Sequence, residues 1–199
     1  MFETGLLLAG EVDPVDVRKQ LSRWTTSGRL YQLRRGLYAL APPFQKIKPH
    51  PFIVANRLVR SSYVSCETAL AHYGLIPEYV PVVTSVTTAR PGCRDTPLGA
   101  FQFHHVKMSL MRGYRLTTVA AGQQAFVATP EKALLDLIYL RPGGDSPVFL
   151  SELRLQALDH LDLDELASLA QASNSPRLRY AAELVAELCR ADALEYQTL

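Results

Sequence analysis

The chain lacks the features that identify several broad classes of protein. Its three cysteines, Cys66, Cys93 and Cys189, are odd in number and widely spaced, so they indicate neither a disulfide framework nor a zinc site. No apolar run approaches the roughly 20 residues that a membrane-spanning helix needs. The first ten residues carry Glu3 and a short apolar stretch instead of the basic leader and long apolar core of a signal peptide. We therefore expect a cytoplasmic protein without a membrane segment.

Motifs with a recognisable chemistry are also scarce. The chain has no glycine-rich phosphate-binding loop. His104 and His105 are adjacent, and in a strand they point to opposite faces, so they do not form one metal site. Ser65, His72 and Asp136 could be considered a catalytic triad, but their spacing in the sequence does not favour one. The pair Glu131-Lys132 is expected at the start of a helix for structural reasons. We predict no metal, no cofactor and no catalytic residues.

The charge is distributed unevenly along the 199 residues, although the net charge is only +2. Residues 1–48 hold eight Lys or Arg and four Asp or Glu, a balance of +4. Residues 149–199 hold four and nine, a balance of −5. A basic beginning and an acidic end suit a nucleic-acid-binding region joined to a region that avoids nucleic acid.

Local signals predict a helix from Pro14 to Ser27. Asp13 is a good N-cap, proline suits the first helical position, and Gly28 suits the left-handed conformation that ends a helix. Val17, Leu21 and Trp24 recur at helical spacing, which predicts one buried stripe.

The other face of this predicted helix is polar and basic. Such side chains reach phosphates and base edges, and arginine can also bind guanine through two hydrogen bonds. The alternative is an ordinary solvated helix face. The residues are Arg18, at the edge of the face, and Lys19, Ser22, Arg23 and Thr26.

A short hairpin is predicted directly after the helix, from Leu30 to Leu40. Apolar and polar residues alternate on both sides of Arg34-Arg35-Gly36, where the glycine supplies the positive φ of a tight turn. Behind a basic helix, Arg34 and Arg35 are predicted to contact DNA phosphates. The order of helix and hairpin predicts a winged helix-turn-helix that binds double-stranded DNA, with only a short packing helix before Asp13.

Proline residues between 42 and 51 predict a domain boundary. We expect a winged helix-turn-helix domain over residues 1–48 and an α+β domain over residues 52–199, with largely independent cores. In the second domain we expect helices over 52–60, 66–73, 130–140, 151–158, 163–172 and 176–193, an extended segment at 63–65, and strands over 80–87, 99–106, 113–119 and 125–127.

Several motifs, in this order and spacing, resemble the AbiEi antitoxin family of bacterial abortive-infection, type IV toxin–antitoxin systems. The resemblance covers residues 18 to about 140. The motifs are Leu21-Ser22-Arg23-Trp24, Gly28-Arg29-Leu30, Leu33-Arg34-Arg35-Gly36-Leu37-Tyr38, Ala55-Asn56-Arg57-Leu58-Val59, Ser62-Tyr63-Val64-Ser65, Ala69-Leu70, Gly74-Leu75-Ile76-Pro77-Glu78, Thr84-Ser85-Val86-Thr87 and Ala128-Thr129-Pro130-Glu131-Lys132-Ala133-Leu134-Leu135-Asp136.

The resemblance implies a bifunctional, non-enzymatic protein. Its winged helix would repress its own operon, and residues 52–199 would counter a nucleotidyltransferase-like toxin encoded next to it, without a stable complex. The chain departs from the family pattern in its short segment before Asp13 and in Cys66, where a leucine-like residue is expected.

Two other functions fit the same basic beginning. One is a nuclease-like enzyme that the winged helix delivers to nucleic acid, and the other is a transcriptional regulator whose second domain senses a ligand or forms a dimer.

At the acidic end we expect Leu184, Val185 and Leu188 to form a buried stripe, with Glu183 and Glu187 beside it.

Overall fold

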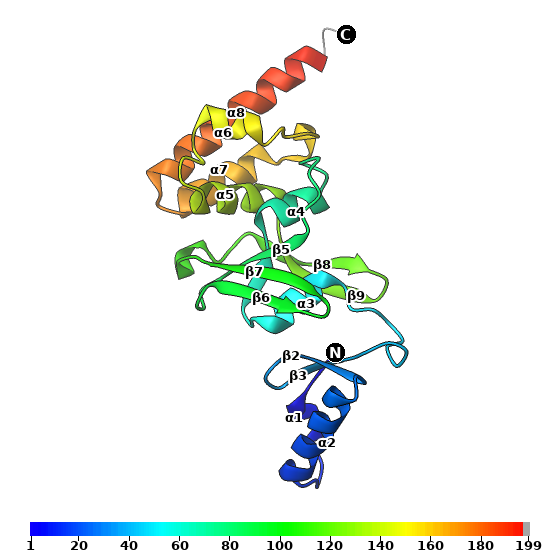
Figure 1. Cartoon of the computed structure of the whole chain (residues 1–199). Helices are drawn as coiled ribbons and strands as arrows, with labels where there is room; N and C mark the ends of the chain where they lie inside the picture. The colour runs from blue at the N-terminus through cyan, green and yellow to red at the C-terminus, as the bar shows by residue number, and fades with distance from the viewer. Residues whose placement is uncertain (197–199) are drawn as a thin grey trace.

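The computed structural model describes residues 1–196 and has three tiers (Figure 1). A small N-terminal module lies at one end, a larger sheet with its helices forms the middle, and a group of C-terminal helices forms the other end. Helices combined with two sheets confirm the expected α+β class. Among the described residues, no helix is both long and apolar enough to cross a membrane.

The N-terminal module contains one long helix and a three-stranded antiparallel sheet of order β1-β3-β2. Helix α2 begins after the Asp13 cap, whose carboxylate accepts a hydrogen bond from the Val15 amide at 2.7 Å. Gly28 and Gly36 have φ values of +71° and +80°, which explains the end of the helix and the tight hairpin turn. The elements are β1 (Phe2–Glu3), α1 (Thr4–Leu7), α2 (Pro14–Thr26), β2 (Leu30–Arg34) and β3 (Leu37–Leu40).

The predicted buried stripe on α2 is wrong in part. Leu21 is buried, with 2% of its surface exposed, but Trp24 is 36% exposed and Val17 is half-buried. Helix α1 has only four residues, and its Leu6 and Leu7 leave the Trp24 side chain partly open to solvent. Trp24 instead lines a shallow apolar hollow at the surface of the module together with Phe2, Leu6, Leu7, Leu40 and Phe44.

The segment that joins the module to the larger sheet is held in place. The Gln123 side chain accepts a hydrogen bond from the His50 amide at 2.8 Å and donates one to the Lys48 carbonyl at 3.2 Å. His50 then caps α3 (Pro51–Leu58) by accepting a hydrogen bond from the Phe52 amide through Nδ1. The proline-containing segment therefore lies against the hairpin formed by β8 (Tyr114–Ala120) and β9 (Gln123–Ala128).

The middle tier is a six-stranded mixed sheet of order β6-β7-β5-β4-β9-β8. Parallel pairs β5–β7 and β4–β9 alternate with antiparallel pairs, and the expected strands are present. Strand β6 was not predicted, because Cys93-Arg94-Asp95 has no apolar alternation and lies at an edge. The strands are β4 (Ser62–Val64), β5 (Val82–Thr87), β6 (Gly92–Thr96), β7 (Gly99–His105), β8 (Tyr114–Ala120) and β9 (Gln123–Ala128).

Helices cover both faces of this sheet. Helix α3 lies on the side toward the N-terminal module, and α4 (Cys66–His72) and α5 (Pro130–Leu140) lie on the other side (Figure 1). Helix α5 begins after the Thr129 cap and buries eight of its eleven residues, including the predicted Leu134, Leu135, Leu137 and Ile138. Leu33, Leu37 and Ala39 of the N-terminal sheet belong to the same contiguous buried cluster as these residues.

The third tier packs on α5 and consists of α6 (Pro147–Glu152), α7 (Leu163–Ala172) and α8 (Pro176–Tyr196). The expected helix over 151–158 is wrong, because Arg154 and Ala157 have left-handed φ values of +45° and +49° that interrupt helical geometry. The helix lies earlier instead, behind the Ser146 cap.

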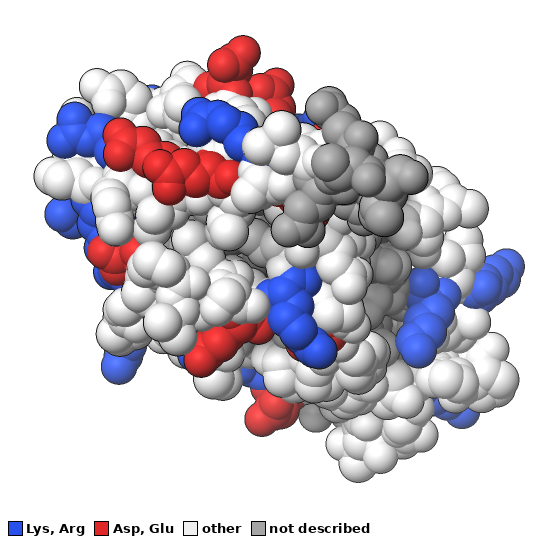
Figure 2. Space-filling model, turned by 90° about the horizontal axis from the view of Figure 1, so that it is seen from above, with Lys and Arg blue, Asp and Glu red and all other residues white. Residues whose placement is uncertain are grey.

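The acidic terminal helix also differs from its prediction. Val185 is buried and Leu184 is half-buried, but Leu188 is exposed, and the stripe continues through Leu178, Ala181 and Ala182. Glu183 and Glu187 are exposed, as expected. Seen from this end of the molecule, acidic and basic side chains are interspersed (Figure 2).

Candidate nucleic-acid interface

Helix α2 and the β2–β3 hairpin together form a groove of about 480 Å³ on the N-terminal module, here called the α2 groove. Arg18, Ser22 and Thr26 line it from the helix, and Arg35 lines it from the hairpin turn. Four of the seven residues predicted to contact DNA therefore share one concave surface. These side chains carry hydrogen-bond donors, and phosphate oxygens and base edges offer the matching acceptors.

Gln32 and Tyr38 also line the α2 groove and were not predicted. They face each other across the β2–β3 ladder, where Gln32 pairs with Tyr38. The alternation of side chains along the two strands could be predicted from the sequence. Which face of the hairpin α2 packs against could not. The additional amide and phenol widen the polar surface beyond the helix itself.

Lys19 and Arg23 lie outside the α2 groove. Lys19 is exposed and lies 3.6 Å from Asp16, an exposed pair that contributes little to stability. Arg23 is exposed in the last turn of α2, where a cation complements the helix dipole. Both side chains are exposed to solvent outside the groove.

The Arg34 guanidinium has several hydrogen-bond partners within the chain. Its guanidinium donates to the carbonyls of Arg57, at 3.2 Å, and Arg35, at 3.1 Å, and to the Glu3 carboxylate at 3.3 Å. Arg60 contacts the other Glu3 oxygen at 2.5 Å. Arg34 therefore connects the hairpin to β1 and α3, and Arg35 is the arginine of the turn that faces solvent.

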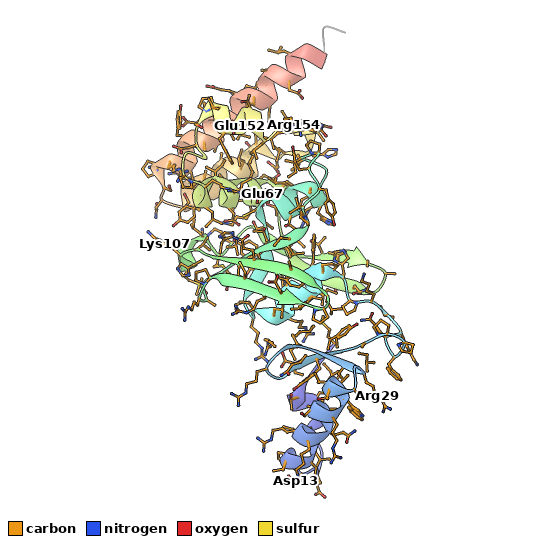
Figure 3. The ribbon with its side chains drawn as sticks, in the orientation of Figure 1. Asp13, Arg29, Glu67, Lys107, Glu152 and Arg154 are labelled. Atoms are coloured by element: carbon orange, nitrogen blue, oxygen red, sulfur yellow. The ribbon has the colours of Figure 1, made fainter. Side chains whose placement is uncertain are left out.

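The charges of the module are graded along α2. Asp13 lies at the end of α2 far from the six-stranded sheet, and Arg29 lies near the other end of this helix (Figure 3). Glu11, Asp13 and Asp16 are exposed at the beginning of the helix, before its basic residues. An approaching polyanion would consequently be attracted toward the later turns of α2 and the hairpin.

The second region contains a closed polar cluster formed by Tyr63, Ser65, Lys132 and Asp136. Tyr63 and Ser65 donate to Asp136 Oδ2 at 2.9 and 2.7 Å, and Lys132 Nζ lies 2.5 Å from Oδ1. The side chains of Lys132 and Asp136 are only 5% and 1% exposed. Burial raises the pKa of the Asp136 carboxyl, and the Lys132 ammonium acts in the opposite direction.

This cluster does not assemble a triad. Ser65 bonds directly to Asp136, but His72 lies at the other end of α4 and packs against Phe52, with ring centroids 5.3 Å apart. Cys66 follows Ser65 with a strained φ of +54°, yet burial raises the pKa of its thiol well above the usual range. A nucleophilic cysteine needs the opposite shift.

The remaining candidate groups also have structural partners. Glu131 is buried and accepts a hydrogen bond from the Asp162 amide at 2.9 Å, which attaches α7 to α5. Tyr73 donates to the Ala128 carbonyl at 3.0 Å. Residues 1–196 contain no group of three His, Cys, Asp or Glu side chains placed to hold a metal ion.

Comparison with known proteins does not identify the chain. No family model matches it, and no curated protein matches its sequence. The assignment of a function therefore depends on the motifs and on the geometry described above.

Proposed function

We propose that the chain is a DNA-binding autorepressor and the antitoxin of a type IV toxin–antitoxin system. In this proposal the N-terminal module acts as a winged helix-turn-helix, with α2 in the major groove and the β2–β3 turn on the DNA backbone. The observation that carries it is the α2 groove, where Arg18, Ser22 and Thr26 share a concave surface with Arg35. The partner is double-stranded DNA from the operator of its own operon.

Salt-dependent binding to the upstream region of its own gene tests this proposal. We expect Arg18→Ala and Arg35→Ala each to weaken binding, because each removes a cation from the groove. Arg179→Ala is the matched control, since Arg179 is exposed on α8 in the acidic third tier. Fluorescence anisotropy at several salt concentrations measures the effect. Equal binding by all three variants would place the interface elsewhere.

The antitoxin activity is supported by the family resemblance of the motifs and belongs to residues 52–199 in this proposal. The expected partner is a nucleotidyltransferase-like toxin encoded by an adjacent gene. Co-expression of the whole chain with that toxin should restore growth, and affinity capture should recover no stable complex. Failure to restore growth would contradict the antitoxin assignment and leave the DNA-binding test unaffected.

The nuclease-like alternative has no comparable support. The polar groups of the Tyr63–Asp136 cluster are sealed from solvent, and each bonds to another member of the cluster. A substrate would have to open the core to reach them. The alternative of a ligand-sensing regulator has a specific observation in its favour, a large cavity beside the six-stranded sheet.

A further inference from the structure

A groove of about 540 Å³ lies between α3 and the β8–β9 hairpin, and is here called the α3 groove. In Figure 1 this hairpin extends from the side of the middle tier, on the right. Helix α3 and the turn before β4 form one wall of the groove, and neighbouring residues of β8 and β9 form the other. None of the described residues lines both this groove and the α2 groove.

The hairpin wall of the α3 groove exposes large apolar side chains. Tyr114 and Leu116 of β8 and Phe126 of β9 are 39%, 52% and 44% exposed. Leu116 and Phe126 are partners in the ladder, and Tyr114 points to the same face as Leu116 because alternate residues of a strand do so. Single exposed apolar residues are ordinary, but three on one strand face that line one groove indicate a binding surface.

The two aromatic rings of this wall are held in place although they are exposed. The Tyr114 ring stacks on the buried Tyr63 ring, with centroids 4.5 Å apart and planes 9° apart, and it meets the Phe126 ring edge-on at 6.0 Å. The Asn56 side chain accepts a hydrogen bond from the Phe126 amide at 2.7 Å and donates one to the Phe126 carbonyl at 3.4 Å. A ligand would meet rings that are already ordered, which lowers the entropy cost of binding.

The charge around the α3 groove is positive. Among the described residues that line it, the charged ones are Arg57 and Arg60, and both are exposed. Arg57 forms no ion pair within residues 1–196, and Arg60 pairs with Glu3. Arg34 donates to the same Glu3 carboxylate and to the Arg57 carbonyl, so three arginines lie near one carboxylate. This leaves a net positive charge for an anionic ligand to neutralise.

Exposed rings beside arginines that lack carboxylate partners match the chemistry of an unpaired nucleic-acid strand. Every base has a flat π face that stacks on an aromatic side chain, and arginine binds the phosphates between the bases. In a duplex the bases stack on one another, so their faces are closed to Tyr114 and Phe126. An acidic peptide would satisfy Arg57, but it offers no series of flat rings for the aromatic wall.

We propose that the α3 groove binds single-stranded nucleic acid, with bases stacked on Tyr114 and Phe126 and a phosphate held by Arg57. This site goes beyond the autorepressor and antitoxin functions and rests on neither of them. It gives the second region a nucleic-acid site of its own, next to the module for which duplex DNA is proposed.

Binding of short oligonucleotides to the full chain tests this proposal. The double variant Arg18→Ala/Arg35→Ala is the background, because it removes cations from the α2 groove and leaves the α3 groove intact. Fluorescence anisotropy measures the binding of oligothymidylate, oligouridylate and a DNA duplex, each of about eight nucleotides per strand. We expect saturable binding of a single strand and at least about tenfold weaker binding of the duplex.

The two single strands separate DNA from RNA as the source of the ligand, since the tighter one identifies the sugar that the groove prefers. A duplex that binds as tightly as either single strand would overturn the proposal. So would the absence of saturable binding by both single strands.

Substitutions in the same background test the assigned residues. Phe126→Leu keeps an apolar side chain but removes the flat ring, so it should weaken single-strand binding at least about fivefold. Phe126→Tyr retains the ring and should bind like the parent, as should the matched control Tyr79→Leu, at an exposed tyrosine outside the α3 groove. Unchanged affinity in Phe126→Leu would contradict the stacking assignment.

The salt dependence of binding tests the phosphate contact. Arg57→Gln should reduce the slope of log affinity against log salt by about 0.7, as expected for one lost phosphate contact with a single strand. Arg179→Gln, at an exposed arginine on α8, should leave the slope unchanged. Equal slopes in both variants would remove Arg57 from the site.

A second copy of the chain is the competing occupant of the α3 groove. Sedimentation velocity of the parent and of Phe126→Leu tests it, and we expect the two proteins to sediment alike. A dimer that dissociates on Phe126→Leu substitution would assign the groove to a subunit interface, against the proposal.

Discussion

Helices α2 and α5 show how differently this chain uses its charged residues. Helix α2 has 13 residues, of which only Leu21 is buried, and its charged side chains are exposed. Helix α5 has 11 residues and buries eight, including Glu131, Lys132 and Asp136. On α2 the charged side chains are open to solvent, whereas on α5 Lys132 and Asp136 pair with each other and Glu131 accepts a hydrogen bond from the Asp162 amide.

This difference shows that a charged residue in a sequence motif need not belong to a binding or catalytic site. Lys132 and Asp136 belong to the longest of the sequence motifs, yet they hold β4, α4 and α5 together through Ser65 and Tyr63. The exposed arginines of α2 make fewer contacts within the fold, and they can reach a ligand. Substitutions in the two helices should consequently separate stability from binding.

The largest effect is expected from Lys132→Met. It leaves the Asp136 carboxylate buried without its cation, which should lower the free energy of unfolding by about 3–5 kcal/mol. Urea denaturation followed by circular dichroism measures the change. DNA affinity per folded molecule should stay the same, because the α2 groove lies in the other region.

The double variant Lys132→Met/Asp136→Asn is the control for this interpretation. The amide oxygen of the introduced asparagine can still accept hydrogen bonds from Tyr63 and Ser65, and the side chain carries no charge. We expect it to recover much of the lost stability. A double variant as unstable as Lys132→Met alone would mean that lost packing, not an unpaired charge, causes the effect.

Most of the fold follows from local signals in the sequence. Helix α2 was predicted from Asp13 and Gly28, and helix α5 from Thr129 and its apolar periodicity, because caps and periodicity are local properties. Strand β6 was missed because its pairing with β7 compensates for a polar composition. The exposure of Trp24 depends on which other segment covers it, and no local pattern contains that information.

The candidate site was predictable only in part for the same reason. Arg18, Ser22 and Thr26 were predicted from the helical face, and the groove unites them with Arg35. Arg34 was assigned the same role as its neighbour because the two residues are chemically identical. Its actual partners, Glu3 and Arg57, are 31 and 23 residues away in the sequence.

The two adjacent arginines give the next prediction. Arg35→Ala should weaken binding to all DNA sequences and reduce the salt dependence by about one unit of slope, as expected for one lost phosphate contact. Arg34→Ala should instead lower the melting temperature, because it removes hydrogen bonds between the hairpin, β1 and α3. Anisotropy and thermal denaturation of both variants separate the roles, and a stable Arg34→Ala protein with a reduced salt slope would reverse them.

A smaller effect is expected from Asp13→Ala. The substitution removes the acceptor for the Val15 amide and should destabilise the beginning of α2 by about 1 kcal/mol. Because α2 is anchored mainly by Leu21, this loss should appear as faster amide hydrogen exchange in the first turn. Asp13→Ser retains a capping oxygen and is the matched control; equal exchange in both variants would show that the cap contributes little.

The smallest effect concerns pH at the junction between the two regions. Burial, together with the nearby His72, lowers the pKa of His50, and burial lowers the pKa of His72. The unfolded chain then binds more protons than the folded chain below the ordinary histidine pKa of about 6.5. Stability should be fully present above that pH and decrease as the pH falls toward the lowered values.

His50→Asn isolates the contribution of the cap. Asparagine can still accept a hydrogen bond from the Phe52 amide, but it does not titrate. The loss of melting temperature between pH 7.5 and about pH 5.5 should therefore be smaller in this variant than in the unsubstituted chain. It should not vanish, because His72 and His104, whose pKa values are also lowered, still take up protons on unfolding. If the melting temperature of His50→Asn fell with pH as steeply as that of the unsubstituted chain, protonation of His50 would not contribute to the acid sensitivity of the junction.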